Sequence, residues 1–215
     1  MLEPVLNKTR EKLMLATEHL LYTDGLARLT TRAIAREAGV AEGALYHHFK
    51  DKAALLLAIV RDRMSDFREM LDGLPLQVGQ RTVRENLEQV LQTAYGSQHR
   101  IAPILCSLFA DRKLLASVQK TLAECGAKPQ YPVEVVAAYL AAEQRLGRVA
   151  QDIVPRAAAQ SMIGGGFHAA IFDHLLGQEL GAASPRRRAQ ETVRTALSGL
   201  EPRVSDTCPV RATGP

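Results

Sequence analysis

Residues Thr30–Lys52 read TTRAIAREAGVAEGALYHHFKDK, and this stretch decides the fold. Its first half has small apolar residues at helical spacing around Ile34, followed by Gly39. Glycine adopts positive φ readily and commonly ends a helix. A second helical segment begins around residues 41–42 and turns Leu45 inward. Two short helices joined by a tight turn with glycine predict a helix-turn-helix unit, whose second helix lies in the major groove of DNA.

The composition predicts an all-α protein that folds as one large domain or two small ones. The chain has 215 residues, of which 47% are hydrophobic and 23% charged, as in ordinary globular proteins. Alanine and leucine dominate, and no run of alternating β-branched residues indicates a strand. The net charge of +4 permits a polyanionic partner. Residues 1–52 hold eight Lys and Arg against seven Asp and Glu, so the DNA argument depends on the placement of charges.

The pattern predicts the following helices. The first covers 8–23, the second is capped by Thr30, and the fourth runs from the cap Asp51 to about Leu71 as one long strut. Further helices are expected at 80–98, 100–110, 111–125, 133–147, 155–178 and 186–200. Pro103 is expected in the first turn of its helix, where a missing N–H is tolerated.

These elements suggest three regions. Residues 1–52 form the helix-turn-helix DNA-binding domain, and residues 53–201 form a larger helical domain for ligand binding and dimerisation. Residues 202–215 contain Pro, Gly, Ser and Thr with little apolar content, and we expect this tail to be disordered.

A multi-position pattern points to a known family. The chain resembles the DNA-binding domain of TetR-type bacterial regulators over roughly residues 8–60, through Thr30-Thr31, Ile34-Ala35, Ala38-Gly39-Val40, Leu45-Tyr46-His47-His48-Phe49 and Lys52. This resemblance implies a homodimeric, cytoplasmic repressor that a small molecule releases from a palindromic operator of double-stranded DNA. One departure is Ala41, where many family members have Ser or Thr, because alanine lacks a side-chain cap worth about 1 kcal/mol.

The resemblance also implies which residues contact DNA. They are Thr31, Arg32, Glu42, Gly43, Ala44, Tyr46, His47, His48 and Lys52. The hydroxyls of Thr31 and Tyr46 and the ammonium of Lys52 are expected at phosphates, contacts that fix register without reading sequence.

The remaining contacts leave alternatives open. Arg32 either reads a guanine or binds a phosphate, and Glu42 either accepts from a cytosine amine or complements the helix dipole. Gly43 would allow close backbone approach, and Ala44 could touch a thymine methyl. His47 and His48 are neighbours, so one at most faces the groove fully, and we favour His48.

The larger domain is far less diagnostic. Six aromatic or polar-tipped residues are candidates for an effector pocket, and each has ordinary core or surface packing as its alternative: Tyr95, His99, Phe109, Tyr139, Phe167 and His168. The consecutive glycines 164–166 indicate backbone crowding or a kink. Residues 155–178 and 186–200 correspond to the family's four-helix dimer interface. Arg186–Arg188 is interpreted as a solvated stripe.

Other kinds of site find little support in the sequence. Three cysteines without a C-x-x-C pair indicate reduced thiols, and the histidines lack partners at metal-ligand spacing, so neither metal nor cofactor is expected besides the effector. No apolar run reaches the ~18 residues of a membrane span, and the N-terminus lacks a signal-peptide core.

Two alternative functions remain. A small helical enzyme would use Cys106, Cys125 or His168, but the chain has no nucleophile elbow, H-E-x-x-H or phosphate loop, and we expect no enzyme. A ligand-independent DNA-binding protein would be favoured by a sealed apolar core without a pocket.

Overall fold

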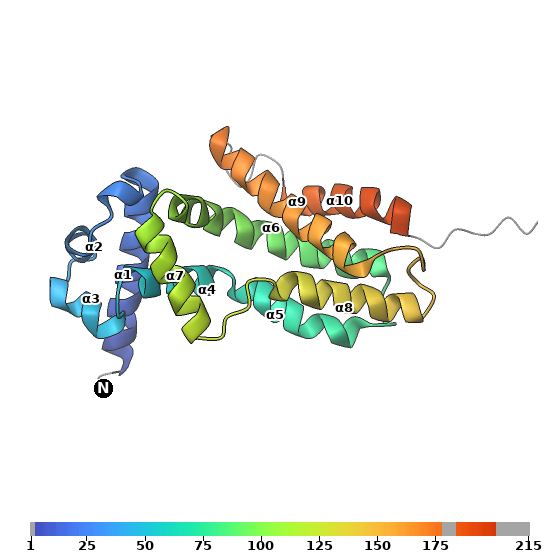
Figure 1. The fold of residues 1–215 in the computed structure, drawn as a ribbon, viewed down its shortest axis with the longest axis horizontal. Coiled ribbons are helices and arrows are strands. Elements are labelled where there is room, and N and C mark those ends of the chain that lie inside the picture. Colours follow the sequence, from blue (N-terminus) through green and yellow to red (C-terminus); the bar gives the residue numbers. More distant parts are fainter. Residues whose placement is uncertain (1–2, 178–183, 201–215) are drawn as a thin grey trace, which may run out of the picture.

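The fold is a small helical head joined to a longer helical body (Figure 1). The computed structural model describes residues 3–177 and 184–200, with side chains at 8–177 and 184–197. The elements are α1 (Glu3–Thr23), η1 (Leu26–Arg28), α2 (Thr31–Glu37), α3 (Glu42–His48), α4 (Lys52–Arg63), α5 (Ser65–Gly73), η2 (Leu74–Gln77), α6 (Val83–Leu108), α7 (Arg112–Glu124), α8 (Tyr131–Arg145), α9 (Pro155–Leu175) and α10 (Pro185–Leu200). Over these residues the chain forms helices joined by turns and loops, without a strand, as its composition predicts. The tail predicted to be disordered lies outside the described residues.

The head consists of α1–α4 around one apolar core. Leu13, Ile34, Leu45, Leu55 and Ile59 are fully buried there. Helix α4 therefore packs with the helix-turn-helix unit, although the predicted domain boundary falls just before it. Burial of side chains from all four helices fixes how α2 and α3 sit on α1.

The head core does not stop at α4. Ile104 and Leu108 of α6 and Leu114 of α7 belong to the same buried cluster. On α1, Glu18 accepts from Arg63 Nε at 2.7 Å, which ties α1 to the end of α4. The head is thus held by apolar contacts from the body as well as by its own helices.

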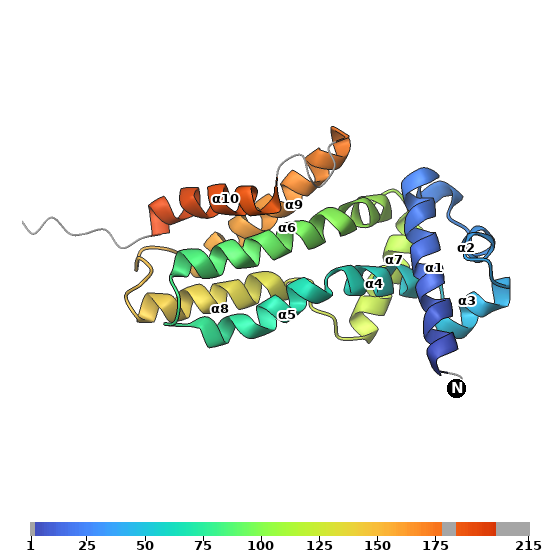
Figure 2. The same ribbon diagram turned by 180° about the vertical axis from the view of Figure 1, so that it is seen from behind.

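The body core lies between α5, α6, α8, α9 and α10, and α6 runs along its whole length (Figure 2). Leu87 and Val90 of α6 are fully buried against Val136 and Leu140 of α8 and Val193 of α10. With 26 residues, α6 spans about 39 Å at 1.5 Å per residue. Its first half belongs to the body core and its last turns belong to the head core.

The single helix predicted from Asp51 to about Leu71 is wrong, because α4 ends at Arg63 and α5 begins at Ser65. Met64 between them has φ −99° and ψ 1°, outside the helical range. The Ser65 hydroxyl donates to the Asp62 carbonyl at 2.7 Å. Such side-chain competition for backbone carbonyls weakens a helix locally, which the apolar spacing does not reveal.

The two helices predicted at 80–98 and 100–110 are one continuous helix, and Pro103 lies inside it rather than in a first turn. Proline has no N–H, so the carbonyl of His99, four residues earlier, loses its helical partner. His174 Nε2 of α9 lies 2.8 Å from that carbonyl oxygen. Because a carbonyl only accepts, His174 must carry its proton on Nε2 and donate. A contact from a distant helix thus replaces the missing bond, and the two imidazole rings stack at 4.1 Å.

This replacement gives a testable double-mutant cycle. His174→Phe keeps a ring at the stack but leaves the His99 carbonyl without its donor, and we expect a loss of about 1–3 kcal/mol in the free energy of unfolding. Pro103→Ala supplies a backbone N–H for the same carbonyl, so it should recover much of that loss in the His174→Phe protein. Urea unfolding of all four proteins measures the coupling. Equal effects of Pro103→Ala in both backgrounds would contradict the replacement.

Candidate nucleic-acid interface and small-molecule cavity

The helix-turn-helix unit lies at the end of the head that is farthest from the body (Figure 1). The Thr30 hydroxyl accepts from the Ala33 N–H at 3.1 Å, which confirms the predicted cap of α2. Gly39 has φ 66° and ends that helix, and the Val40 N–H donates to the Ala35 carbonyl at 3.0 Å. Local sequence therefore sets the angle between α2 and α3.

The turn leads into α3 without a side-chain cap. Ala41 has the extended conformation of an N-cap residue, with φ −65° and ψ 144°, but makes no capping hydrogen bond. Asp51, by contrast, caps α4 by accepting from the Ala54 N–H at 2.8 Å. Both features agree with the sequence.

The outer face of α3 is exposed and polar. Glu42, Gly43, Tyr46 and His47 are exposed, whereas Leu45 points into the head core. Of the other residues predicted to contact DNA, Arg32 is exposed, and Thr31, Ala44, His48 and Lys52 are half-buried. Tyr46 is 57% exposed, so its hydroxyl is free to meet a partner. All nine residues thus come from α2, α3 and the start of α4.

Three of the residues predicted to contact DNA also form hydrogen bonds within the head. The Thr31 hydroxyl donates to Glu42 Oε1 at 3.1 Å, which links the first turns of α2 and α3. Lys52 Nζ donates to the Leu29 carbonyl at 3.4 Å. Glu42 therefore has a structural role beside the two alternatives left open by the sequence.

Sequence reasoning missed Arg36. It is exposed one turn after Arg32 on α2, and both arginines line a hollow between α2 and α3 that extends to Glu42. Two cations at i,i+4 spacing share a helix face, so this spacing could have identified the pair. Guanidinium groups beside an exposed α3 suit the phosphates of a DNA backbone.

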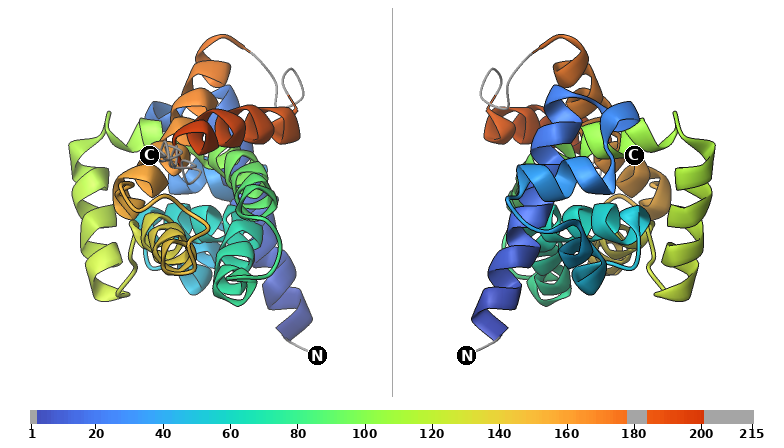
Figure 3. Two further views of the ribbon diagram at one scale, coloured as in Figure 1. Left: turned by 90° about the vertical axis from the view of Figure 1, so that its right-hand side faces the viewer. Right: turned by 90° about the vertical axis from the view of Figure 1, so that its left-hand side faces the viewer.

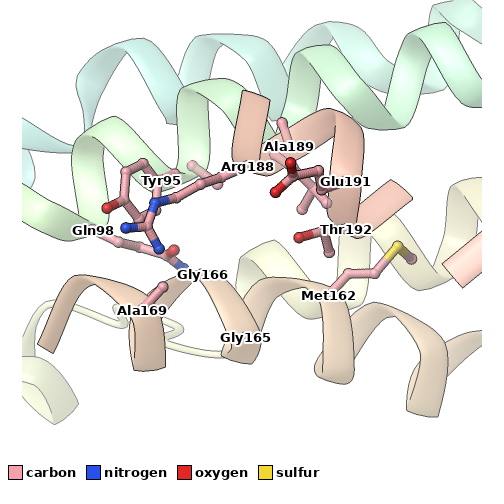
Figure 4. Close-up of a pocket in the computed structure, with 12 residues that line it drawn as sticks. Tyr95, Gln98, Met162, Gly165, Gly166, Ala169, Arg188, Ala189, Glu191 and Thr192 are labelled. Carbon is pink, nitrogen blue, oxygen red and sulfur yellow. The ribbon is translucent and has the colours of Figure 1, made fainter. Parts of the chain in front are cut away.

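A second candidate site is a cavity of about 180 Å³ between α6, α9 and α10. Its wall includes apolar and polar side chains from all three helices, drawn in Figure 4: Leu91, Ala94, Tyr95, Gln98, Met162, Ala169, Arg188, Ala189, Glu191 and Thr192. Gly165 and Gly166 contribute bare backbone from α9.

Of the six residues predicted for a pocket, Tyr95 lines this cavity. His99 is buried nearby and stacks on His174, and Phe167 is half-buried. Tyr139 instead lies in the body core, where its hydroxyl accepts from Asn86 Nδ2 at 2.9 Å.

The other two lie at the surface. His168 is exposed and stacks on Phe172 at 4.6 Å. Phe109 is 75% exposed at the end of α6, so it does not line the cavity. Polar-tipped aromatics were a weak guide because helix position, not residue type, decides what faces the cavity.

A buried polar network forms one end of the cavity. The Tyr95 hydroxyl donates to Asp173, and burial together with this hydrogen bond raises the pKa of Tyr95 to about 12. Arg188 Nη2 donates to the other oxygen of Asp173 at 2.8 Å, and its guanidinium carbon lies 5.2 Å from the Tyr95 ring centroid. The interpretation of Arg186–Arg188 as a solvated stripe is therefore wrong for Arg188, which is half-buried.

Backbone crowding, one of two readings of the three glycines, applies at Gly166. A Cβ there would lie 2.5 Å from Gln98 Oε1, whereas nothing lies within 4 Å of one at Gly164 or Gly165. Gln98 of α6 therefore rests directly on the backbone of α9. Alanine at 166 would force the amide of Gln98 to move.

Membrane spans and metal clusters are both absent from the described residues. No helix there combines the length and apolarity that crossing a membrane requires. Nor do three or more His, Cys, Asp or Glu side chains gather at a position suited to a metal ion within 3–177 and 184–200.

The head is similar in sequence to known bacterial regulators. Residues 13–59 match the family model "Bacterial regulatory proteins, tetR family". The HTH-type transcriptional regulator TtgR of Pseudomonas putida is 43% identical over 53 residues, which span 25% of this chain and 25% of TtgR. The head is therefore similar in sequence to the heads of tetR-family regulators, and the match spans about a quarter of the length of TtgR.

Solved structures agree over nearly the whole fold. FadR from Bacillus subtilis, in complex with stearoyl-CoA, superposes with a TM-score of 0.67 at 17% identity, covering 88% of this chain and 98% of FadR. SmeT, the repressor of the Stenotrophomonas maltophilia multidrug efflux pump SmeDEF, superposes with a TM-score of 0.63 at 20% identity. The superposition covers 97% of this chain and 98% of SmeT. The body thus shares its architecture with those proteins.

The uncapped start of α3 yields a prediction about stability. Ala41→Thr adds a hydroxyl that can accept an orphan N–H of the first turn, so it should raise the free energy of unfolding by about 0.5–2 kcal/mol. Ala41→Val has the same shape without the acceptor and is the matched control. Thermal unfolding compares the two. If threonine stabilises no more than valine, the start of α3 needs no side-chain cap.

Proposed function

We propose that this chain is a homodimeric, ligand-responsive transcriptional regulator that represses neighbouring genes by binding a palindromic operator. The observation that carries the proposal is the exposed polar face of α3, held by a helix-turn-helix with a capped α2 and a turn at Gly39. The tetR-family match covers this head. As a DNA-binding regulator of the bacterial type, the chain would act in the cytoplasm.

In this proposal the residues divide into two classes. Tyr46, Thr31 and Lys52 bind phosphates and set the register of the head on the duplex. Arg32 reads a base edge, with Arg36 beside it at the backbone. The exposed Tyr46 and the arginine pair along α2 support this division.

Dimerisation is proposed through α9 and α10, which lie together along one side of the molecule (Figure 3). Phe172, Leu175 and Leu176 at the end of α9 are 45%, 74% and 66% exposed. A cluster of this kind is poorly soluble unless a partner covers it. A two-fold pair of such faces would place two recognition helices on one side of a duplex.

Ligand response is proposed to pass through α6. The sequence predicts a strut from Asp51 to about Leu71 between the two regions, but the cavity is lined by α6, α9 and α10. Helix α6 passes from the cavity at Tyr95 and Gln98 to the head core at Ile104 and Leu108. A ligand that changes the fit of α6 on α9 therefore acts on the head and, through α9, on the pairing of protomers.

The similar proteins support the repressor role by what their names record. FadR was solved with stearoyl-CoA bound, and SmeT is the repressor of a multidrug efflux pump. Both share the fold with this chain, so a cavity in its body is a fitting place for an effector.

The alternatives have less support. For an enzyme, Cys106 and Cys125 are exposed thiols and His168 stacks on Phe172. No hydrogen bond joins any two of these side chains in the described part of the chain. The ligand-independent DNA-binding protein was expected to have a sealed core, whereas this body has an open cavity with polar groups.

The roles on DNA are tested by three substitutions and a control. Tyr46→Phe and Lys52→Ala should weaken binding to all duplexes alike, and Lys52→Ala should lower the salt slope by about one unit. Arg32→Ala should instead relax the preference at one base pair in each half-site, at a cost of roughly 1–3 kcal/mol. Arg145→Ala removes an exposed arginine at the far end of α8 and should change neither the affinity for DNA nor the base preference.

The measurement is fluorescence anisotropy with the duplex that the unaltered chain selects, and with single-base variants of it. Because Lys52 also donates to the Leu29 carbonyl, the melting temperature of Lys52→Ala separates lost stability from lost contact. A changed base preference in Lys52→Ala, with none in Arg32→Ala, would reverse the assigned roles.

A further inference from the structure

The cavity between α6, α9 and α10 restricts the size of a ligand. Its volume is about 180 Å³, below the roughly 300–1,000 Å³ typical of sites for drug-sized molecules. An apolar cavity of about 150 Å³ in another protein holds one benzene molecule. The space therefore suits a compact molecule about the size of one ring.

One wall of the cavity offers a hydrogen-bond acceptor. Gln98 is 5% exposed, and its Nε2 donates to the Ile163 carbonyl at 2.9 Å. This bond fixes which end of the amide is oxygen. Gln98 Oε1 is buried and has no hydrogen-bond partner among the described residues. A buried acceptor is costly to leave unpaired, so Oε1 is suited to a ligand N–H or O–H.

The same end of the cavity offers a donor. The Arg188 side chain reaches from α10 toward Tyr95 and Gln98 (Figure 4). Its Nη2 is engaged by Asp173, whereas its Nε is buried and has no partner among the described residues. The free N–H at Nε is suited to a ligand oxygen.

Charge at this end is already balanced. Arg188 is paired with Asp173, which also accepts from Tyr95. At the opposite end, Glu191 accepts from Arg187 Nε at 2.9 Å. A charged ligand would lose its hydration without meeting an unpaired opposite charge, which disfavours it.

Apart from the Thr192 side chain, the remaining wall is apolar (Figure 4). Leu91, Ala94, Met162 and Ala169 line it together with the backbone of Gly165. We infer that the effector of this regulator is a small uncharged molecule of about one ring, whose adjacent donor and acceptor bind Gln98 Oε1 and Arg188 Nε. A phenol meets both requirements with one hydroxyl, and a lactam meets them with its N–H and carbonyl. The effector role rests on the proposed function.

The test uses four probes and one reporter on the full chain. The probes are phenol, 2-pyrrolidone, benzene and benzoate, titrated into protein labelled with ¹³C at the methionine methyls. Met162 lines the cavity, whereas Met14, Met64 and Met70 do not and serve as internal references. Phenol and 2-pyrrolidone should shift the Met162 methyl at lower concentration than benzene, and benzoate should bind most weakly.

Two substitutions locate the polar contact. Gln98→Leu removes the acceptor and should weaken phenol binding about fivefold to tenfold, the effect of one hydrogen bond. The affinity for benzene should stay unchanged. Gly166→Ala displaces the Gln98 amide from its present position and should likewise reduce the preference for phenol over benzene. Gln92→Leu, on the exposed face of α6, is the matched control and should change nothing.

The outcomes separate the claims. No shift at Met162 with any probe, tighter binding of benzoate than of phenol, or an equal loss of benzene and phenol in Gln98→Leu would overturn the ligand class. Phenol binding that leaves DNA affinity unchanged would overturn the effector role. DNA binding is measured separately without any probe, and its failure would overturn the proposed function while the methyl titration still reports on the cavity.

Discussion

Helix α6 must remain one continuous element although it carries a proline in its interior, and the rest of the structure depends on this. Its first turns bury Leu87 and Val90 in the body, and its last turns bury Leu108 in the head. The backbone bond lost at Pro103 falls between these two regions, and His174 of α9 replaces it. The stability of head and body is therefore coupled through α6, and the contact from α9 supports this helix between the two cores.

The same helix would connect the cavity to DNA binding in the proposed regulator. Gln98 touches the cavity one turn before Pro103, and α9 supplies both the opposite wall and the donor of the replacement bond. A molecule seated against Gln98 and Arg188 would change the packing of α6 on α9 at the point where α6 lacks one of its own hydrogen bonds. The fold thus offers a short physical route from the effector to the head, within one pair of helices.

How far the sequence predicts this protein depends on whether a feature is local. Thr30, Gly39, Ala41 and Asp51 act within a few residues of themselves, so the helix-turn-helix and its caps were predicted correctly. Pro103 was misplaced because its compensation comes from α9, 71 residues away in the chain (174 minus 103). For the same reason Gln98 and Arg188 were missed at the cavity, since only the packing of three helices brings them together. Of six residues chosen there by chemical type, Tyr95 alone lines it.

The central claim is that two copies of this chain read a symmetric DNA sequence with their α3 helices. Selection of duplexes from a random library by the purified protein tests this most directly. Our account predicts an enriched palindrome whose half-sites are centred about 10–10.5 base pairs, or a multiple of that spacing, apart. Enrichment of a single asymmetric half-site would contradict the dimer, and no enrichment of any sequence would contradict DNA reading by this head.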